Sequence, residues 1–142
     1  MPRKRRGFSY PLTSRRVRVE EIELVAQRVA RVILSHVEGS LLLVETWTSA
    51  ARTLGAQVKA FRSRSGAPGF YQGGQQPVIY YNMEAPTPDR IRYIVHELAH
   101  HVLATWPDTA FPRTSCECFD DDRQTVQHRI ARRVEDVLLE ED

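Results

Sequence analysis

The chain has 142 residues, a length that suits one domain with a substantial core and leaves little room for a second. Its composition, 42% hydrophobic and 27% charged, is that of an average folded protein and excludes a fibrous or wholly disordered chain. No apolar run approaches the ~20 residues needed to cross a bilayer, and the basic residues 1–6 lead into no signal-peptide core. These features predict a cytoplasmic protein without a membrane partner.

The net charge of +2 is unevenly distributed along the chain. Residues 1–18 hold seven of the 20 Lys and Arg side chains and no acid, so residues 19–142 carry 13 basic against 18 acidic side chains. We expect residues 1–18 to form a basic, flexible arm and residues 19–142 to form a single domain. Because Lys and Arg release counterions from phosphates, residues 3–18 are also a candidate for weak nucleic-acid contact, against the alternative of a solvated terminus.

Two helices are predicted in the first half of the chain. Between residues 20 and 37 apolar side chains recur every three or four residues, the period of an amphipathic helix. A second helical stretch over residues 41–54 closes at Gly55, which suits the left-handed backbone of a helix C-terminus.

A small sheet is predicted after these helices. Residues 57–61 alternate between apolar and polar side chains, as in a strand. Residues 70–71 and 78–81 predict two strands joined around Gly73-Gly74. We expect the three strands to form an antiparallel sheet.

Two further helices are predicted in the second half. Thr87 is the expected N-cap of the third helix, with Pro88 at the first helical position, where its missing N–H costs nothing. This helix should end near Thr105. After a loop, the acidic residues 120–122 cap a last helix that continues to about residue 139. The predicted fold class is therefore α+β, a helical body with a small antiparallel sheet.

The third predicted helix contains His96-Glu97-Leu98-Ala99-His100, an HExxH motif. Two histidines four residues apart lie on one face of a helix, where both imidazoles can bind a single Zn²⁺. Glu97 is placed to take a proton from metal-bound water and pass it to a leaving amine. The motif predicts one zinc ion per chain, with His96 and His100 as ligands and Glu97 as the catalytic base.

A catalytic zinc site normally has three protein ligands and an open position for water. Apart from the motif and the adjacent His101, the chain contains two more histidines, His36 and His128. On a helical wheel His128 falls on the flank of the last helix's apolar stripe, a position that can reach the groove between two packed helices. His128 is therefore the predicted third ligand. The alternatives are Glu135, Asp122 and Cys118.

A peptidase also needs a donor, besides the metal, for the oxyanion of the tetrahedral intermediate. The candidates near the motif are Tyr80, Tyr81, Tyr93 and His101. For each of these side chains taken alone, a structural place in the core is the favoured interpretation. Four apolar residues of the third helix should pack on the sheet and the first helix, namely Ile91, Val95, Leu98 and Val102.

The two cysteines, Cys116 and Cys118, lie in the loop before the last helix. They are too close in sequence for an ordinary disulfide and too few for a disulfide framework. A second structural zinc would need a second cysteine pair, so we interpret them as two thiols in a loop.

The stretch from Arg90 to Leu103 resembles the core of the ImmA/IrrE metallopeptidases, in which an Arg-containing turn and an apolar pair precede HELxH. Residues 54–58 and 78–82 are similar to the strand elements before that helix in the family. Residues 128–139 are similar to the family's following helix, whose first residue is a Glu that binds zinc, and His128 falls at that position. The resemblance implies a minimal, zincin-like metallopeptidase of gluzincin type.

The resemblance further implies a protein substrate, namely a separate helix-turn-helix repressor whose cleavage derepresses stress-response or mobile-element genes. Two departures from the family pattern keep open a second interpretation, a zinc-stabilised regulatory or binding module with weakened catalysis. His128 replaces the ligand Glu, and Arg132 replaces an Asn or Asp. A third interpretation is a SprT-like protease that acts on DNA-bound proteins, but such proteases usually carry a Cys-rich zinc ribbon.

Overall fold

The computed structural model describes residues 19–105, 116–117 and 126–140. The described helices are α1 (Val19–Leu34), α2 (Val44–Thr53), α3 (Thr87–Ala104) and α4 (Val126–Leu139). The described strands are β1 (Gln57–Phe61), β2 (Gly69–Gln72), β3 (Val78–Asn82) and β4 (Cys116–Glu117). The predicted α+β class is confirmed. The predicted arm, residues 1–18, lies outside the described residues. None of the described helices combines the length and the apolar character needed to span a bilayer.

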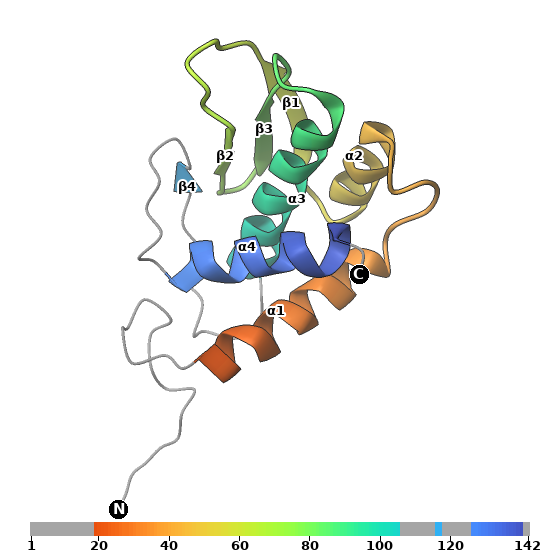
Figure 1. Ribbon diagram of the computed structural model, residues 1–142, viewed down its shortest axis with the longest axis vertical. Coiled ribbons are helices and arrows are strands. Elements are labelled where there is room, and N and C mark those ends of the chain that lie inside the picture. Colours follow the sequence, from red (N-terminus) through yellow and green to blue (C-terminus); the bar gives the residue numbers. More distant parts are fainter. Residues whose placement is uncertain (1–18, 106–115, 118–125, 141–142) are drawn as a thin grey trace, which may run out of the picture.

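Helix α3 lies at the centre of the fold (Figure 1), where it contacts α1, α2, α4 and the strands β2 and β3. The four predicted stripe residues of α3 are all buried, namely Ile91, Val95, Leu98 and Val102. Burial of an aliphatic side chain of this size contributes about 1.5–3 kcal/mol of hydrophobic free energy. Packing on several sides therefore holds the helix that carries the HExxH motif in a fixed position.

The sheet has the strand order β1-β3-β2-β4 and is mixed. β2 and β3 pair antiparallel around the turn that contains Gly74, which has a φ of 114°. β1 and β3 pair in parallel, with Gln57 opposite Val78 and Phe61 opposite Asn82. The predicted antiparallel sheet is therefore wrong at this pair. β3 inserts between β1 and β2, and because the chain reverses on each side of β2, β1 and β3 run the same way.

Element boundaries differ from the sequence prediction by a few residues. α1 ends at Leu34 rather than near residue 37, and α2 begins at Val44 rather than near residue 41. The N-cap of α3 is Pro86 rather than Thr87. Gly55 has a φ of 96° after α2, so its predicted left-handed conformation is confirmed. Cys116 was expected in a loop but pairs in β4 with Tyr71 of β2, a contact that local sequence does not encode.

Candidate metal centre

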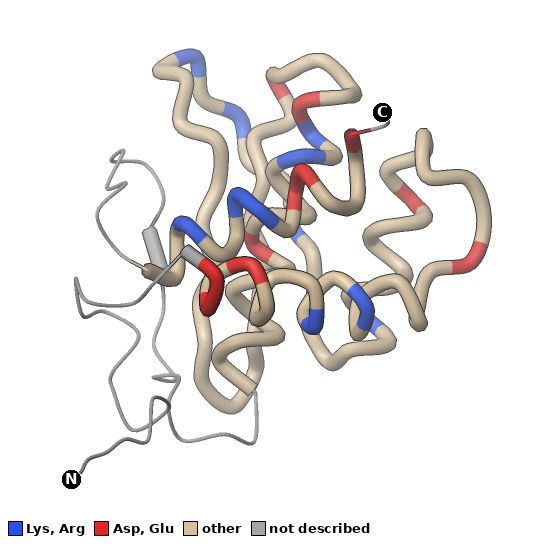
Figure 2. Tube along the Cα trace, turned by 60° about the horizontal axis from the view of Figure 1, so that its bottom comes forward, with Lys and Arg blue, Asp and Glu red and all other residues tan. Residues whose placement is uncertain are grey.

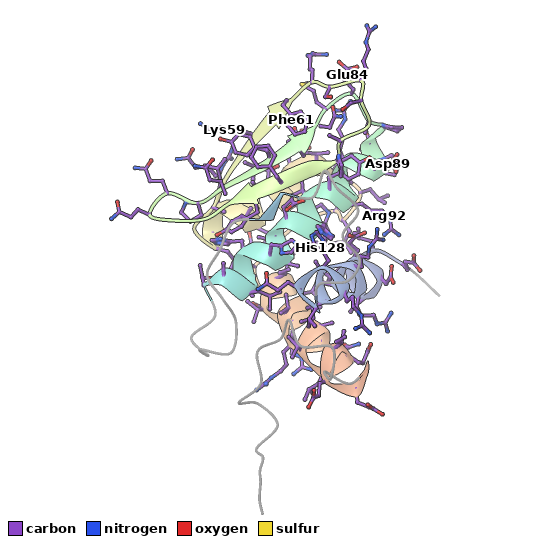
Figure 3. All side chains as sticks on the ribbon, turned by 90° about the vertical axis from the view of Figure 1, so that its left-hand side faces the viewer. Lys59, Phe61, Glu84, Asp89, Arg92 and His128 are labelled. Atoms are coloured by element: carbon purple, nitrogen blue, oxygen red, sulfur yellow. The ribbon has the colours of Figure 1, made fainter. Side chains whose placement is uncertain are left out.

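Helices α3 and α4 bring three histidines together. Figure 3 labels one of them, His128. His96 and His100 lie one turn apart on α3, and His128 lies near the described start of α4. One ligand nitrogen from each imidazole lies within 4.8 Å of the others. The ring centroids are 4.9 Å apart for His96–His100, 5.5 Å for His96–His128 and 5.0 Å for His100–His128. The three side chains are close enough to bind one metal ion.

The donor set suits a tetrahedral transition metal. Imidazole nitrogens bound at about 2.1 Å to tetrahedral Zn²⁺ lie roughly 3.4 Å from one another. The separations of up to 4.8 Å would have to shorten toward that value when an ion binds. Among the described residues the cluster offers three ligands, the number that a catalytic zinc site takes from its protein, with water at the fourth tetrahedral position.

Packing of α4 directs His128 toward this point. The buried face of α4 consists of Val126, Ile130, Ala131, Val134 and Leu138. This face packs on α1 and α3. At about 100° per residue His128 is roughly 60° from Ala131 around the helix, on the flank of the buried face. The position of α4 beside α3 therefore agrees with the placement of His128 predicted from the helical wheel.

Glu135, an alternative third ligand in the sequence analysis, lies behind His96. One oxygen of its carboxylate, Oε2, is 2.6 Å from Nδ1 of His96, and the other, Oε1, accepts a hydrogen bond of 3.0 Å from Nη1 of Arg92. A carboxylate accepts and does not donate, so Nδ1 of His96 carries the proton. The second ring nitrogen, Nε2, is then the one left for a metal. Sequence reasoning missed this role of Glu135 and the contribution of Arg92.

Glu97 is almost completely buried, with 1% of its surface exposed. At about 100° per residue it lies roughly 60° from His100 around α3, toward the side of the helix that carries the histidines. Glutamate is among the residues least often buried in proteins unless it is paired or has a specific use. The burial and position of Glu97 are compatible with its predicted role as the catalytic base.

His101 is bound on both ring nitrogens within the core. Its Nε2 donates to the carbonyl oxygen of Leu54 at 2.7 Å, and its Nδ1 accepts from the hydroxyl of Tyr71 at 2.8 Å. Burial lowers the pKa of His101, which keeps the ring neutral, and the hydrogen bond to Leu54 opposes this effect in part. These contacts give His101 a structural role between α3, β2 and the end of α2. Tyr71, which the sequence analysis did not single out, is its partner.

Of the three candidate tyrosines, Tyr93 shares the histidine face of α3. It precedes His96 by three residues and His100 by seven, so the three side chains project from one side of the helix. Burial, together with the charge of Asp89, raises the pKa of Tyr93, so its phenol keeps its proton to a higher pH than an ordinary tyrosine does.

The other two tyrosines are neighbours on β3 and therefore point to opposite faces of the sheet. Tyr81 packs against the core, whereas Tyr80 stacks on Phe70 with ring centroids 4.4 Å apart. The structure thus separates Tyr80 from the core face on which α3 packs.

Other sequence candidates take no part in the described cluster. Asp122 and Cys118 lie outside the described residues, and so does the candidate nucleic-acid segment, residues 3–18. His36 follows α1, and its Nδ1 lies 2.9 Å from the carbonyl oxygen of Val32. In the view of Figure 2, basic and acidic residues are interspersed along the described chain.

Comparisons of the chain with protein-family models, with characterised proteins and with solved structures found no match.

Proposed function

We propose that this chain is a zinc-dependent endopeptidase in which His96, His100 and His128 hold the metal. The observation that carries the proposal is the convergence of these three imidazoles around an HExxH helix that also buries Glu97. Zinc is the default ion for a site of three imidazoles, although nitrogen ligands bind other first-row metals as well. When bound, the metal would act as a Lewis acid toward water and the scissile carbonyl group.

The protein side chains take separate roles in the proposed reaction. Glu97 removes a proton from the attacking water and transfers it to the leaving amine, a contribution of about 10²–10⁴-fold for general acid–base catalysis. Tyr93 is our choice of donor to the oxyanion, because it lies on the same face of α3 as His96 and His100. His96 is oriented by Glu135.

The resemblance to ImmA/IrrE metallopeptidases supports a zincin-like fold and a helix-turn-helix repressor as the substrate. We propose a separate repressor protein, cleaved in the cytoplasm to derepress stress-response or mobile-element genes. In this proposal the basic residues 3–18 help the peptidase to reach a substrate that is bound to DNA.

The test is an incubation of the zinc-loaded protein with a purified helix-turn-helix repressor encoded beside its gene, followed by intact-mass spectrometry. We expect cleavage at one bond by the wild type, inhibition by a chelator, and a rate at least about 10²-fold lower for Glu97→Gln. Glu97→Gln should keep its zinc, since Glu97 is not a ligand.

Two outcomes would contradict this proposal. Undiminished cleavage by Glu97→Gln would remove the base from the mechanism. A wild type that holds zinc but leaves the repressor and a broad peptide library uncut would favour the second interpretation, a zinc-stabilised regulatory module.

A further inference from the structure

A chain of polar contacts runs from the histidine cluster to the surface between α3 and α4. His96 is hydrogen-bonded to Glu135 at 2.6 Å, and Glu135 is bonded to Arg92 at 3.0 Å. Nη2 of Arg92 then donates to Glu140 at 3.0 Å, and Asp136 lies 3.9 Å from Nη1. His96 and Arg92 belong to α3, and the carboxylates belong to α4 or follow it directly.

The first link of this chain is shielded from water. The side chains of His96 and Glu135 are 12% and 13% exposed. In such surroundings a hydrogen bond from an imidazole to a carboxylate is stronger than on an open surface. It fixes the proton on Nδ1 of His96 and the orientation of the ring, so that the lone pair of Nε2 is available to a metal.

The second link keeps Glu135 in place. The guanidinium of Arg92 is permanently charged and bonds two carboxylates through two of its nitrogens. The positive charge of Arg92 therefore compensates the negative charge of the Glu135 carboxylate beside His96. Arg92 also attaches the second half of α4 to α3.

Residue spacing on α4 explains why His128 and Glu135 act at one place. They are seven residues apart, so at about 100° per residue they project from nearly the same side of the helix, two turns apart. His128 reaches the cluster itself, whereas Glu135 reaches the far nitrogen of His96.

We propose that Glu135 is a positioning residue of the metal centre, which orients His96 and fixes its tautomer, and that Arg92 holds Glu135 in that position. The proposal rests on the metal site of the proposed function. Outer contacts of this kind typically change metal affinity 10–100-fold when they are removed.

The experiment compares the zinc dissociation constants of the wild type and three variants by competition with a chromophoric chelator. We expect Glu135→Ala to bind zinc about 10–100-fold more weakly. Glu135→Gln should lose less, because its amide oxygen can still accept from His96. Glu23→Gln is the matched control, because it breaks another ion pair of α4, that of Arg133 with Glu23 on α1, and should leave zinc affinity unchanged.

A second readout needs no metal. In the metal-free wild type, ¹⁵N NMR of the histidine rings should show the proton of His96 on Nδ1, and in Glu135→Ala the tautomer population should shift toward Nε2–H. Failure of the wild type to bind zinc would refute the proposed function, while this NMR comparison still decides the role of Glu135.

Three results would overturn the role of Glu135. They are wild-type zinc affinity in Glu135→Ala, an unchanged His96 tautomer in that variant, and an equal loss of zinc affinity in Glu23→Gln, which would reduce the contact to general packing of α4. If Glu135→Ala does not fold, Glu135→Leu, which is closer in volume and cannot accept a hydrogen bond, gives the same comparison, and wild-type zinc affinity with an unchanged His96 tautomer in that variant would overturn the proposal.

Discussion

At the scale of single residues, Asn82 shows how one buried side chain organises the segments around α3. Its Nδ2 donates to the carbonyl oxygens of Ser63 and Ala67, each at 2.8 Å. Its Oδ1 accepts from the backbone N–H groups of Ser63 at 3.2 Å and Glu84 at 3.0 Å. Asn82 thus joins the loop after β1 to the turn that leads into α3.

We predict that Asn82→Asp destabilises the protein by about 3 kcal/mol at neutral pH, because a carboxylate replaces two donors and faces two carbonyl oxygens. Urea denaturation measures the loss, and it should shrink in acid, where a protonated Asp can donate again. Ser65→Ala, in the same loop but exposed, is the control and should cost less than about 0.5 kcal/mol. A fully stable Asn82→Asp variant would refute the assignment of its amide donors.

The hydroxyl of Tyr71 satisfies a nitrogen of His101 inside the core. We predict that Tyr71→Phe lowers the free energy of unfolding by about 1–3 kcal/mol, because Nδ1 of His101 is left buried without its donor. Tyr80→Phe is the control, since Tyr80 lies on the other face of the sheet, and it should have a smaller effect. Equal losses in the two variants would contradict the role of this hydrogen bond.

The buried hydroxyl of Tyr71 should also make the stability of the protein depend on pH. Burial raises the pKa of Tyr71 to about 12, above its ordinary value of about 10. Between these values the unfolded chain releases a proton that the folded protein keeps, so stability should fall as the pH rises from about 10 to 12. Denaturation curves across this window should show a smaller decline in Tyr71→Phe than in the wild type.

The role of a residue can be predicted from the sequence when its partners are close along the chain, and less well when they are distant. His96, Glu97 and His100 are one local motif, and His128 was found because helical periodicity puts it beside a buried stripe. The roles of Glu135 and His101 were missed, because they depend on Arg92, 43 residues from Glu135, and on Tyr71, 30 residues from His101. Local patterns contain no information on such pairs.

At the scale of elements, α1 and α4 are joined by the ion pair of Glu23 and Arg133. Nε of Arg133 donates to Glu23 at 2.6 Å, and both side chains are 42% exposed. Hydrogen bonds from Arg133 and then from Gln27 lower the pKa of Glu23. A lowered pKa means that the folded protein favours the charged carboxylate, so this stabilisation is present above the ordinary pKa of Glu and is lost as the pH falls.

We predict that Glu23→Gln changes stability by no more than about 1 kcal/mol at neutral pH, as is usual for exposed ion pairs. Its stability should also decline less than that of the wild type as the pH falls below about 4.3, the ordinary pKa of Glu. Denaturation curves from pH 7 to pH 3 measure both effects. Identical acid profiles for the two proteins would contradict the contribution of this pair.

The elements themselves differ in how well the sequence predicts them. The first helix was predicted from its apolar period, the second from its closing glycine, and the third and fourth from the residues that start them. Several helix ends were misplaced by a few residues, because capping is a local competition between similar conformations. The β2–β3 hairpin followed from its turn. The parallel pairing of β1 with β3 and the short β4 did not follow, since alternation indicates a strand without indicating its partner or direction.

At the scale of the whole molecule, the proposed zinc joins two helices that are distant in sequence. α3 supplies His96 and His100, and α4 supplies His128, so a bound ion stabilises only the arrangement in which these helices are packed together. We predict that free zinc at about 100 times its dissociation constant stabilises the wild type by about 2.7 kcal/mol. Thermal unfolding with and without zinc measures the gain, which should be largely lost in His128→Ala and kept in His36→Ala.

The proposed metal centre is tested most directly by the metal content of the purified protein, measured by mass spectrometry. The proteins compared are the wild type, His128→Ala, Glu97→Gln and His36→Ala. We expect about one zinc per chain in the wild type, in Glu97→Gln and in His36→Ala, and a substantial loss of zinc in His128→Ala. A wild type without bound metal after zinc loading, or a His128→Ala variant that keeps its zinc at wild-type affinity, would contradict a centre built from His96, His100 and His128.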